Sequence, residues 1–145
     1  MTTEIKKVVA YITSGRRLLV FEHTEFPEAG IQVPAGTVDP GEDPQTAVLR
    51  EAYEETGLSN LKLVRALGKR TFKGDGRTYV RHFFRLFCPG QPPERWRHME
   101  EDPSNDTNEP IEFELYWASW PDGIPALAAE MDALLAAVDW DSLPS

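Results

Sequence analysis

The first third of the chain alternates short apolar runs with turn residues. Residues 7–12 and 17–23 are rich in Val, Ile, Leu and Phe, with a Ser-Gly pair between them. They predict a β-hairpin or two adjacent strands. Residues 25–30 are rich in turn formers, and residues 31–33 predict a short extended piece.

A helix is predicted over residues 44–56. Asp43 is a suitable N-cap, and Pro44 suits the first helical position. Gly57 can end the helix in a left-handed cap. The apolar stripe that should face the core consists of Val48, Leu49, Ala52 and Tyr53.

Two longer strands are predicted at residues 61–72 and 78–88, joined by a Gly-Asp-Gly turn. On one face of the second strand, Arg81 and Arg85 alternate with aromatic residues, Tyr79 among them. Such a face could contact an aromatic, anionic ligand. Alternatively, the arginines could pair with neighbouring carboxylates of a half-buried strand.

The pattern weakens and then returns in the last third. Residues 91–110 contain four prolines and many acids, which predicts a long loop that is either mobile or functional. Residues 112–120 predict another strand. A final packing helix is predicted over residues 124–138, where apolar residues recur at helical spacing: Ile124, Leu127, Ala128, Met131, Leu134, Leu135 and Val138.

These elements predict an α/β fold, a sheet with helices on both faces in an α/β/α sandwich. A length of 145 residues with 41% apolar and 27% charged residues fits one domain over residues 1–145. No apolar run approaches the roughly 20 residues needed to cross a bilayer. A single cysteine, Cys88, excludes an internal disulfide and a Cys-based zinc site. We therefore expect a cytoplasmic protein without membrane contacts.

The charge is unevenly distributed along the chain. The net charge is −9, yet residues 62–97 hold ten Lys or Arg and two acids, and residues 98–114 hold seven acids and no base. An acidic protein is a poor general binder of nucleic acids. The basic segment suits a small anion, or it neutralises the acids around it.

Three carboxylates share one face near the end of the predicted helix. Glu51, Glu54 and Glu55 stand at i, i+3 and i+4, where like charges destabilise a helix, and the helix dipole disfavours anions at this end. A hard divalent cation such as Mg²⁺ would reverse that repulsion. The alternative is a solvated acidic face.

The same glutamates belong to a longer pattern of fixed spacing. It resembles the Nudix box, G-x5-E-x7-R-E-U-x-E-E-x-G-U, in which U is a bulky aliphatic residue. Leu58 fits the last U, whereas Ala52 is smaller than the usual aliphatic residue. The resemblance implies a Nudix-like sandwich, with a mixed β-sheet flanked by the box helix and a C-terminal helix. The seven fixed residues are Gly36, Glu42, Arg50, Glu51, Glu54, Glu55 and Gly57.

The resemblance implies Mg²⁺-dependent hydrolysis of a diphosphate bond in a nucleoside diphosphate derivative, with Mn²⁺ as the alternative ion. Glu51, Glu54 and Glu55 would carry the metal, and Gly36 would let the backbone approach it. Arg50 would fix the geometry of Glu54. The general base would be a box glutamate, with Glu54 the first candidate, or an acid from outside the box. The outside candidates are Glu100 and Glu101 in the loop, and Glu112 and Glu114 on the next strand, which we favour because a strand positions a base better.

The substrate is less defined than the reaction. Nucleoside triphosphates, nucleotide sugars and 5′-triphosphorylated RNA ends all fit, and a catalytically silent nucleotide sensor is the alternative function. The resemblance also admits a homodimer, since many relatives are dimers. The bases expected to hold outer phosphates include Lys69, Arg70, Arg81 and Arg85. Candidates for stacking on a nucleobase are Phe26, Phe72, Tyr79, Phe83 and Trp96.

Overall fold

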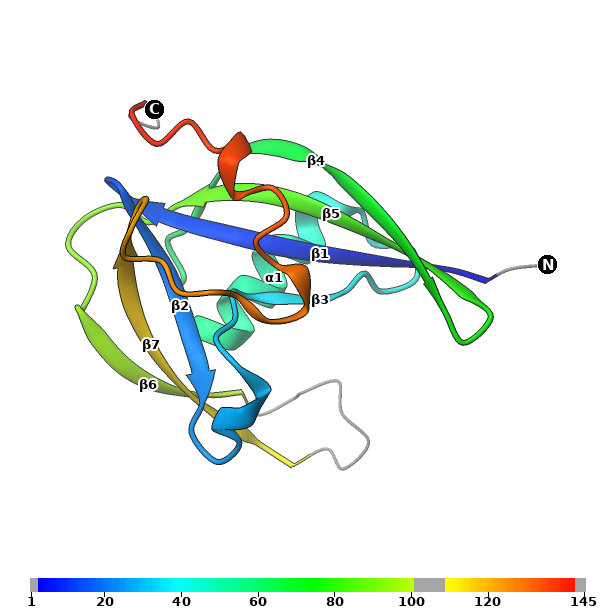
Figure 1. Cartoon of the computed structure of the whole chain (residues 1–145), viewed down its shortest axis with the longest axis horizontal. Coiled ribbons are helices and arrows are strands. Elements are labelled where there is room, and N and C mark those ends of the chain that lie inside the picture. The colour runs from blue at the N-terminus through cyan, green and yellow to red at the C-terminus, as the bar shows by residue number, and fades with distance from the viewer. Residues whose placement is uncertain (1–2, 101–108, 143–145) are drawn as a thin grey trace.

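The structure is a computed structural model that describes residues 3–100 and 109–142. Seven strands in this part of the chain form one mixed sheet (Figure 1). The strand order is β4-β5-β1-β2-β7-β6, and β3 pairs with β1. The strands are β1 Thr3–Ser14, β2 Arg17–His23, β3 Ala35–Thr37, β4 Lys62–Gly74, β5 Arg77–Phe87, β6 Arg95–Glu100 and β7 Ile111–Ser119, and the helix is α1 Pro44–Thr56.

Strand β1 lies at the centre of the molecule. It runs parallel to β5 and antiparallel to β2 and β3. Val8 and Ile12 point into one core and Val9 and Tyr11 into the other, all with at most 1% exposure. A strand buried on both faces requires a layer on each side of the sheet.

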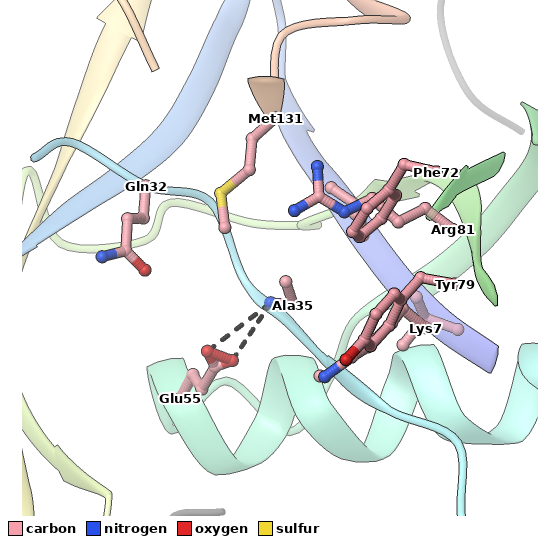
Figure 2. A pocket seen from close by; sticks show the side chains of 11 residues that line it. Lys7, Gln32, Ala35, Glu55, Phe72, Tyr79, Arg81 and Met131 are labelled. Atoms are coloured by element: carbon pink, nitrogen blue, oxygen red, sulfur yellow. Dashed lines mark hydrogen bonds between the residues drawn. The ribbon is translucent and has the colours of Figure 1, made fainter. Parts of the chain in front are cut away.

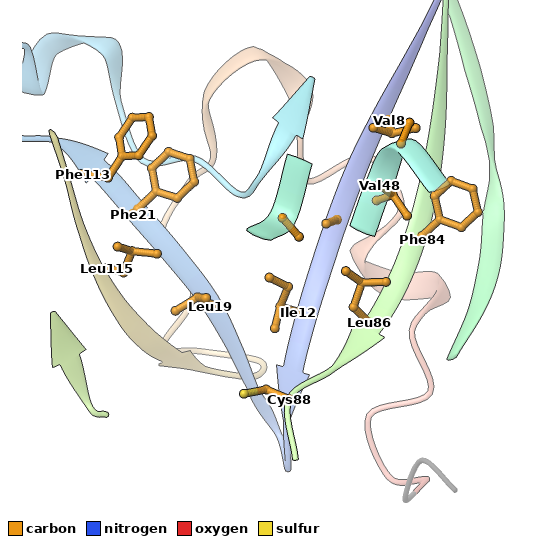
Figure 3. Packing of buried hydrophobic residues seen from close by; sticks show 13 residues of the cluster. Val8, Ile12, Leu19, Phe21, Val48, Phe84, Leu86, Cys88, Phe113 and Leu115 are labelled. Atoms are coloured by element: carbon orange, nitrogen blue, oxygen red, sulfur yellow. The ribbon is translucent and has the colours of Figure 1, made fainter. Parts of the chain in front are cut away.

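Helix α1 forms the layer on one face, as the sequence predicted. The Asp43 side chain accepts a hydrogen bond from the Thr46 N–H at 2.8 Å, and Gly57 ends the helix with a φ of 79°. Val48 packs among residues of β1, β2, β5 and β7, and Figure 3 shows these side chains converging from separate strands.

The C-terminal segment covers the other face, where Figure 1 shows it crossing the sheet in orange and red. It was predicted as one helix over residues 124–138, and that prediction is wrong. The segment instead forms two short 3-10 turns, Ala128–Glu130 and Leu135–Ala137. Five of the seven predicted apolar positions are nevertheless buried: Leu127, Met131, Leu134, Leu135 and Val138.

A backbone contact explains why no helix forms there. The Ala128 N–H donates to the Ile31 carbonyl at 2.8 Å, and Leu127 pairs with Ile31 as in parallel strands. Ala129 and Glu130 then adopt positive φ angles, which a right-handed helix cannot contain. The bridge to Ile31 therefore sets the path of this segment, and its successive turns still bury apolar side chains.

The long loop expected over residues 91–110 contains β6, which pairs with β7. Alternate β6 residues point inward, where the Trp96 indole N–H donates to the Thr56 carbonyl at 3.0 Å and a His98 ring nitrogen lies 2.9 Å from the Glu54 carbonyl. Because most residues of β6 are polar, the sequence does not show that its side chains alternate between inward and outward positions.

Among the described residues, no helix is long and apolar enough to cross a membrane.

Candidate active site

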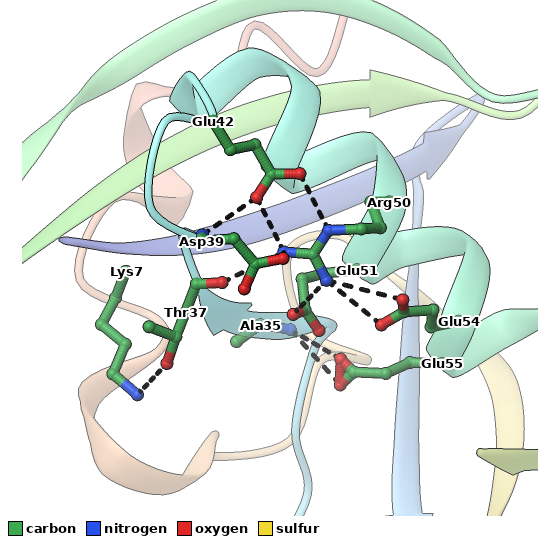
Figure 4. A network of polar contacts seen from close by, with 9 residues as sticks. All are labelled: Lys7, Ala35, Thr37, Asp39, Glu42, Arg50, Glu51, Glu54 and Glu55. Atoms are coloured by element: carbon green, nitrogen blue, oxygen red, sulfur yellow. Dashed lines mark hydrogen bonds and ion pairs between the residues drawn. The ribbon is translucent and has the colours of Figure 1, made fainter. Parts of the chain in front are cut away.

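Arg50 organises the loop before α1 and the carboxylates on it (Figure 4). Its guanidinium donates two hydrogen bonds of 2.9 Å to Glu42, one of 2.9 Å to Glu51 and one of 3.1 Å to the Thr37 carbonyl. The expected pair with Glu54 is present at a longer 3.3 Å. Glu42 is therefore the main partner of Arg50.

Glu42 supports the loop between β3 and α1. One of its oxygens also accepts the Asp39 N–H at 3.0 Å. The hydrogen bonds from Arg50, together with that backbone donor, lower the pKa of Glu42 to about 2. Glu42 and Arg50 thus form a charged pair that stays ionised throughout the physiological pH range.

Glu51 lies directly against the backbone of Gly36. A Cβ atom added to Gly36 would lie 2.1 Å from the Glu51 carboxyl carbon, so any other residue here would force the Glu51 carboxylate to move. Glu51 is 6% exposed. Burial raises its pKa to about 7, against the opposing effect of Arg50, and Glu54 and Glu100 add to the rise.

Glu55 is equally buried, at 6% exposure, and accepts the Ala35 N–H at 3.1 Å. Burial raises its pKa well above the usual range, and the charges of Glu100 and Glu51 raise it further. Two adjacent buried carboxylates that resist ionisation need a cation if both are to be charged at neutral pH.

The donor set fits a hard divalent cation, which prefers oxygen ligands. The side chains of Glu51 and Glu55 are held beside the backbone of Ala35 and Gly36, and Glu54 lies about one helical turn from Glu51. Within the part of the chain that the structure describes, no three acidic, His or Cys side chains converge tightly enough to enclose an ion as they stand. Arg50 donates to one oxygen of Glu51 and lies near both oxygens of Glu54, so a metal would share these carboxylates with Arg50 or draw them away from it.

A cavity of about 370 Å³ opens beside Glu55 (Figure 2). Lys7, Arg81, Phe72 and Tyr79 line it on the sheet, and Figure 2 shows Gln32 and Met131 across from them. The Lys7 ammonium donates to the Thr37 hydroxyl at 2.8 Å. Burial, and then the charge of Arg81, lower the pKa of Lys7. The cavity therefore joins two cations and two aromatic rings to a buried carboxylate.

Comparison with known proteins matches the NUDIX domain model to residues 4–138. The chain belongs to the Nudix family. Members of this family generally use divalent metal ions.

The Nudix chain resembles an RNA pyrophosphohydrolase of Bartonella quintana, with 45% identity over 53 residues. This match covers 35% of the chain and 30% of the relative, so the chain spans less than a third of that relative's length. Two solved structures share the fold at 20% identity. The ORF135 protein of E. coli has a TM-score of 0.63 over 94% of this chain and 89% of its own, and a UDP-X diphosphatase has 0.65 over 94% and 62%.

The acids expected to supply a base lie apart from one another. Glu112 and Glu114, which we favoured, form ion pairs with Arg97 and Arg95 on the neighbouring strand, at 3.4 and 3.3 Å. Glu100, at the inner end of β6, is buried and acts electrostatically on both Glu51 and Glu55. Glu101 lies outside the described residues. Of the described candidates, Glu100 is therefore the one that interacts with the box carboxylates.

The candidates for substrate contact also separate. Arg81 lines the cavity, whereas Lys69 and Arg70 lie exposed on β4. The expectation for Arg85 is wrong, because its side chain is 2% exposed and its guanidinium donates to the Asp139 carbonyl and the Ser142 hydroxyl. It ties the C-terminal segment to the sheet.

Of the stacking candidates, Phe72 and Tyr79 line the cavity. Phe83 lies in the core, Trp96 packs against the α1 side of the sheet, and Phe26 is exposed beside His23.

Sequence reasoning missed Lys7, Gln32 and Met131 as cavity residues. Lys7 gave a weak signal, since it is a charged residue beside the apolar run of β1. Met131 gave none, because its spacing fitted a packing position.

Proposed function

We propose that the protein hydrolyses the diphosphate bond of a nucleoside diphosphate derivative, with Mg²⁺ as its cofactor and Mn²⁺ as a substitute. The observation that carries this proposal is the pair of buried carboxylates on α1: Glu55 lines a cavity that also holds Lys7 and Arg81, and Glu51 lies against Gly36 of the same cavity wall. Anionic and cationic groups in one cavity suit a substrate bound through both metal and phosphate.

Glu51, Glu54 and Glu55 would hold the metal, which would neutralise the diphosphate and lower the pKa of the attacking water. Lys7 and Arg81 would hold the phosphate oxygens away from the metal. A carboxylate near the water would take its proton, and Glu100 is our candidate. Attack on phosphorus breaks the bridge and gives a monophosphate and a phosphorylated remainder.

The test measures product formation from a panel of nucleoside triphosphates, nucleotide sugars and 5′-triphosphorylated RNA, with Mg²⁺, with Mn²⁺ and with a chelator. Names among the relatives and fold neighbours, RNA pyrophosphohydrolase and UDP-X diphosphatase, justify the last two classes. Glu55→Gln should lose most turnover. Metal-independent turnover, or binding of a nucleotide without turnover, would contradict the proposal, and the latter would favour a sensor.

A further inference from the structure

The β4–β5 hairpin carries about half of the positive charge of an acidic chain. Residues 62–81 contain seven Lys or Arg and one acid, Asp75, although the chain's net charge is −9. Among the residues that the structure describes, none of these seven bases forms an ion pair with a carboxylate. They do not neutralise neighbouring acids, so their charge is available to an external anion.

Strand register places four cations and two aromatic rings on one face. Arg70 stands opposite Arg81, and Phe72 stands opposite Tyr79; directly opposite residues share a face. Lys7 stands beside Arg81 on β1, and Arg77 is two residues from Tyr79. We call this set the hairpin patch: Lys7, Arg70, Phe72, Arg77, Tyr79 and Arg81.

The aromatic rings form the centre of the patch. Phe72 and Tyr79 stack with centroids 4.9 Å apart and an interplanar angle of 9°. The Arg81 guanidinium lies 5.0 Å from the centroid of the Phe72 ring, and Phe72 is 41% exposed. Tyr79 is partly buried beside it. Accessible aromatic rings flanked by cations are the combination with which proteins bind single-stranded nucleic acids, because bases stack on the rings and phosphates contact the cations.

The patch is continuous with the active-site cavity. Lys7, Phe72, Tyr79 and Arg81 belong to both, and the same cavity reaches Glu55. Arg77 lies four residues along β5 from Arg81, a distance of about 13 Å in an extended strand. Figure 1 shows the hairpin projecting beyond the body of the molecule, in green. A ligand with one end at Glu55 would therefore continue outward over the patch.

We propose that the hairpin patch binds a single-stranded nucleic acid, whose bases stack beside Phe72 and Tyr79 while its phosphates contact Arg70, Arg77 and Arg81. One consequence rests on the proposed function: the phosphorylated 5′ end of such a strand would occupy the cavity. It differs from general nucleic-acid binding because it is confined to one face of one hairpin.

Binding can be measured separately from hydrolysis. A fluorescent RNA of about twelve nucleotides with a 5′-hydroxyl has no phosphoanhydride to cleave, and its anisotropy is followed with a chelator over a series of salt concentrations. We expect Arg70→Gln/Arg77→Gln to reduce the log–log salt slope by about 1.4 and to weaken binding roughly tenfold at about 0.15 M salt.

The matched control is Lys69→Gln/Lys73→Gln, on the same strand and with the same loss of charge. These lysines stand opposite His82 and Thr78, so they point to the other face. We expect a loss of less than about threefold from this variant. Equal losses from the two double variants would show attraction to the hairpin's total charge and would overturn the proposal, as would failure of the wild-type protein to bind the RNA at low salt.

A third variant tests the class of ligand. Phe72→Leu keeps the charge and should weaken RNA binding at least about fivefold while leaving the binding of inorganic polyphosphate unchanged. Equal losses for both ligands, or a poly-glutamate peptide that binds as tightly as RNA, would overturn the assignment to nucleic acid. Hydrolysis of nucleotides without RNA binding would refute the patch and leave the proposed function standing.

Discussion

Replacing Glu51 by Gln should stabilise the protein without metal and abolish its stabilisation by Mg²⁺. The pKa of Glu51 rises from 4.5 to about 7 on folding, chiefly because of burial. The native state thus binds the extra proton, and this favourable contribution is complete below about pH 4.5 and lost as the pH rises through about 7. The shift corresponds to about 3 kcal/mol.

Gln resembles the protonated acid at every pH. In a chelator, we expect Glu51→Gln to match the wild-type free energy of unfolding near pH 4.5 and to exceed it by up to about 3 kcal/mol above pH 7. Denaturant unfolding at a series of pH values measures the free energy of unfolding of the variant and of the wild type. Glu54→Gln is the control, since it removes the same charge from a side chain that is about a third exposed.

Adding Mg²⁺ should raise the wild-type stability increasingly as the pH rises, because the metal binds the ionised carboxylates. The variant should gain little and should lose most of its turnover. If Glu51→Gln is less stable than the wild type above pH 7 in chelator, the hydrogen bond from Arg50 outweighs the cost of burial, and the reasoning fails.

Two further predictions concern groups around Glu51. Gly36→Ala should cut turnover about 100-fold or more, because its methyl group displaces the Glu51 carboxylate. Gly74→Ala, where a Cβ meets open space, should retain the rate, and equal rates for the two variants would contradict the close approach. Glu100→Gln should lower kcat about 100-fold and flatten the acidic limb of the pH profile at an unchanged KM. Glu112→Gln and Glu114→Gln should leave kcat and the pH profile unchanged. If one of these variants loses kcat and Glu100→Gln does not, the general base is a glutamate of β7.

The box helix was predictable because its signals are local. Asp43, Pro44 and Gly57 fix its ends through contacts within a few residues. The spacing of the glutamates then fixes their common face, whatever the rest of the chain does. Gly57 has a second role that the sequence did not reveal, since a Cβ there would lie 2.9 Å from the His98 ring.

The elements that failed prediction depend on partners far away in the chain. The residues after β7 follow the path set by a backbone bridge to Ile31, which no helical periodicity can foresee. Strand β6 hides its alternation because its inward residues, Trp96, His98 and Glu100, are mostly polar. That polarity is also what brings Glu100 to the other carboxylates.

The substrate side of the site was only partly predictable for the same reason. The alternation of Arg81 with Tyr79 identified the face of β5 that carries the substrate candidates, but the same pattern also predicted that Arg85 would contact the substrate. Only the path of the C-terminal segment distinguishes them, since it buries Arg85 beneath Asp139 and Ser142 and leaves Arg81 at the cavity. Residues on one face of a strand share an orientation, whereas their solvent access depends on what packs above them.

The arrangement of charges separates the structural part of the box from its reactive part. Arg50 donates two of its three 2.9 Å carboxylate hydrogen bonds to Glu42, whose pKa is lowered, so this pair can hold the loop before α1 whether or not a metal is bound. Glu51 and Glu55 have raised pKa values and contact the backbone around Gly36, so their charge can respond to a cation. A cation can therefore draw Glu51 and Glu54 from Arg50 while Glu42 keeps the guanidinium, and the loop need not refold when the metal binds.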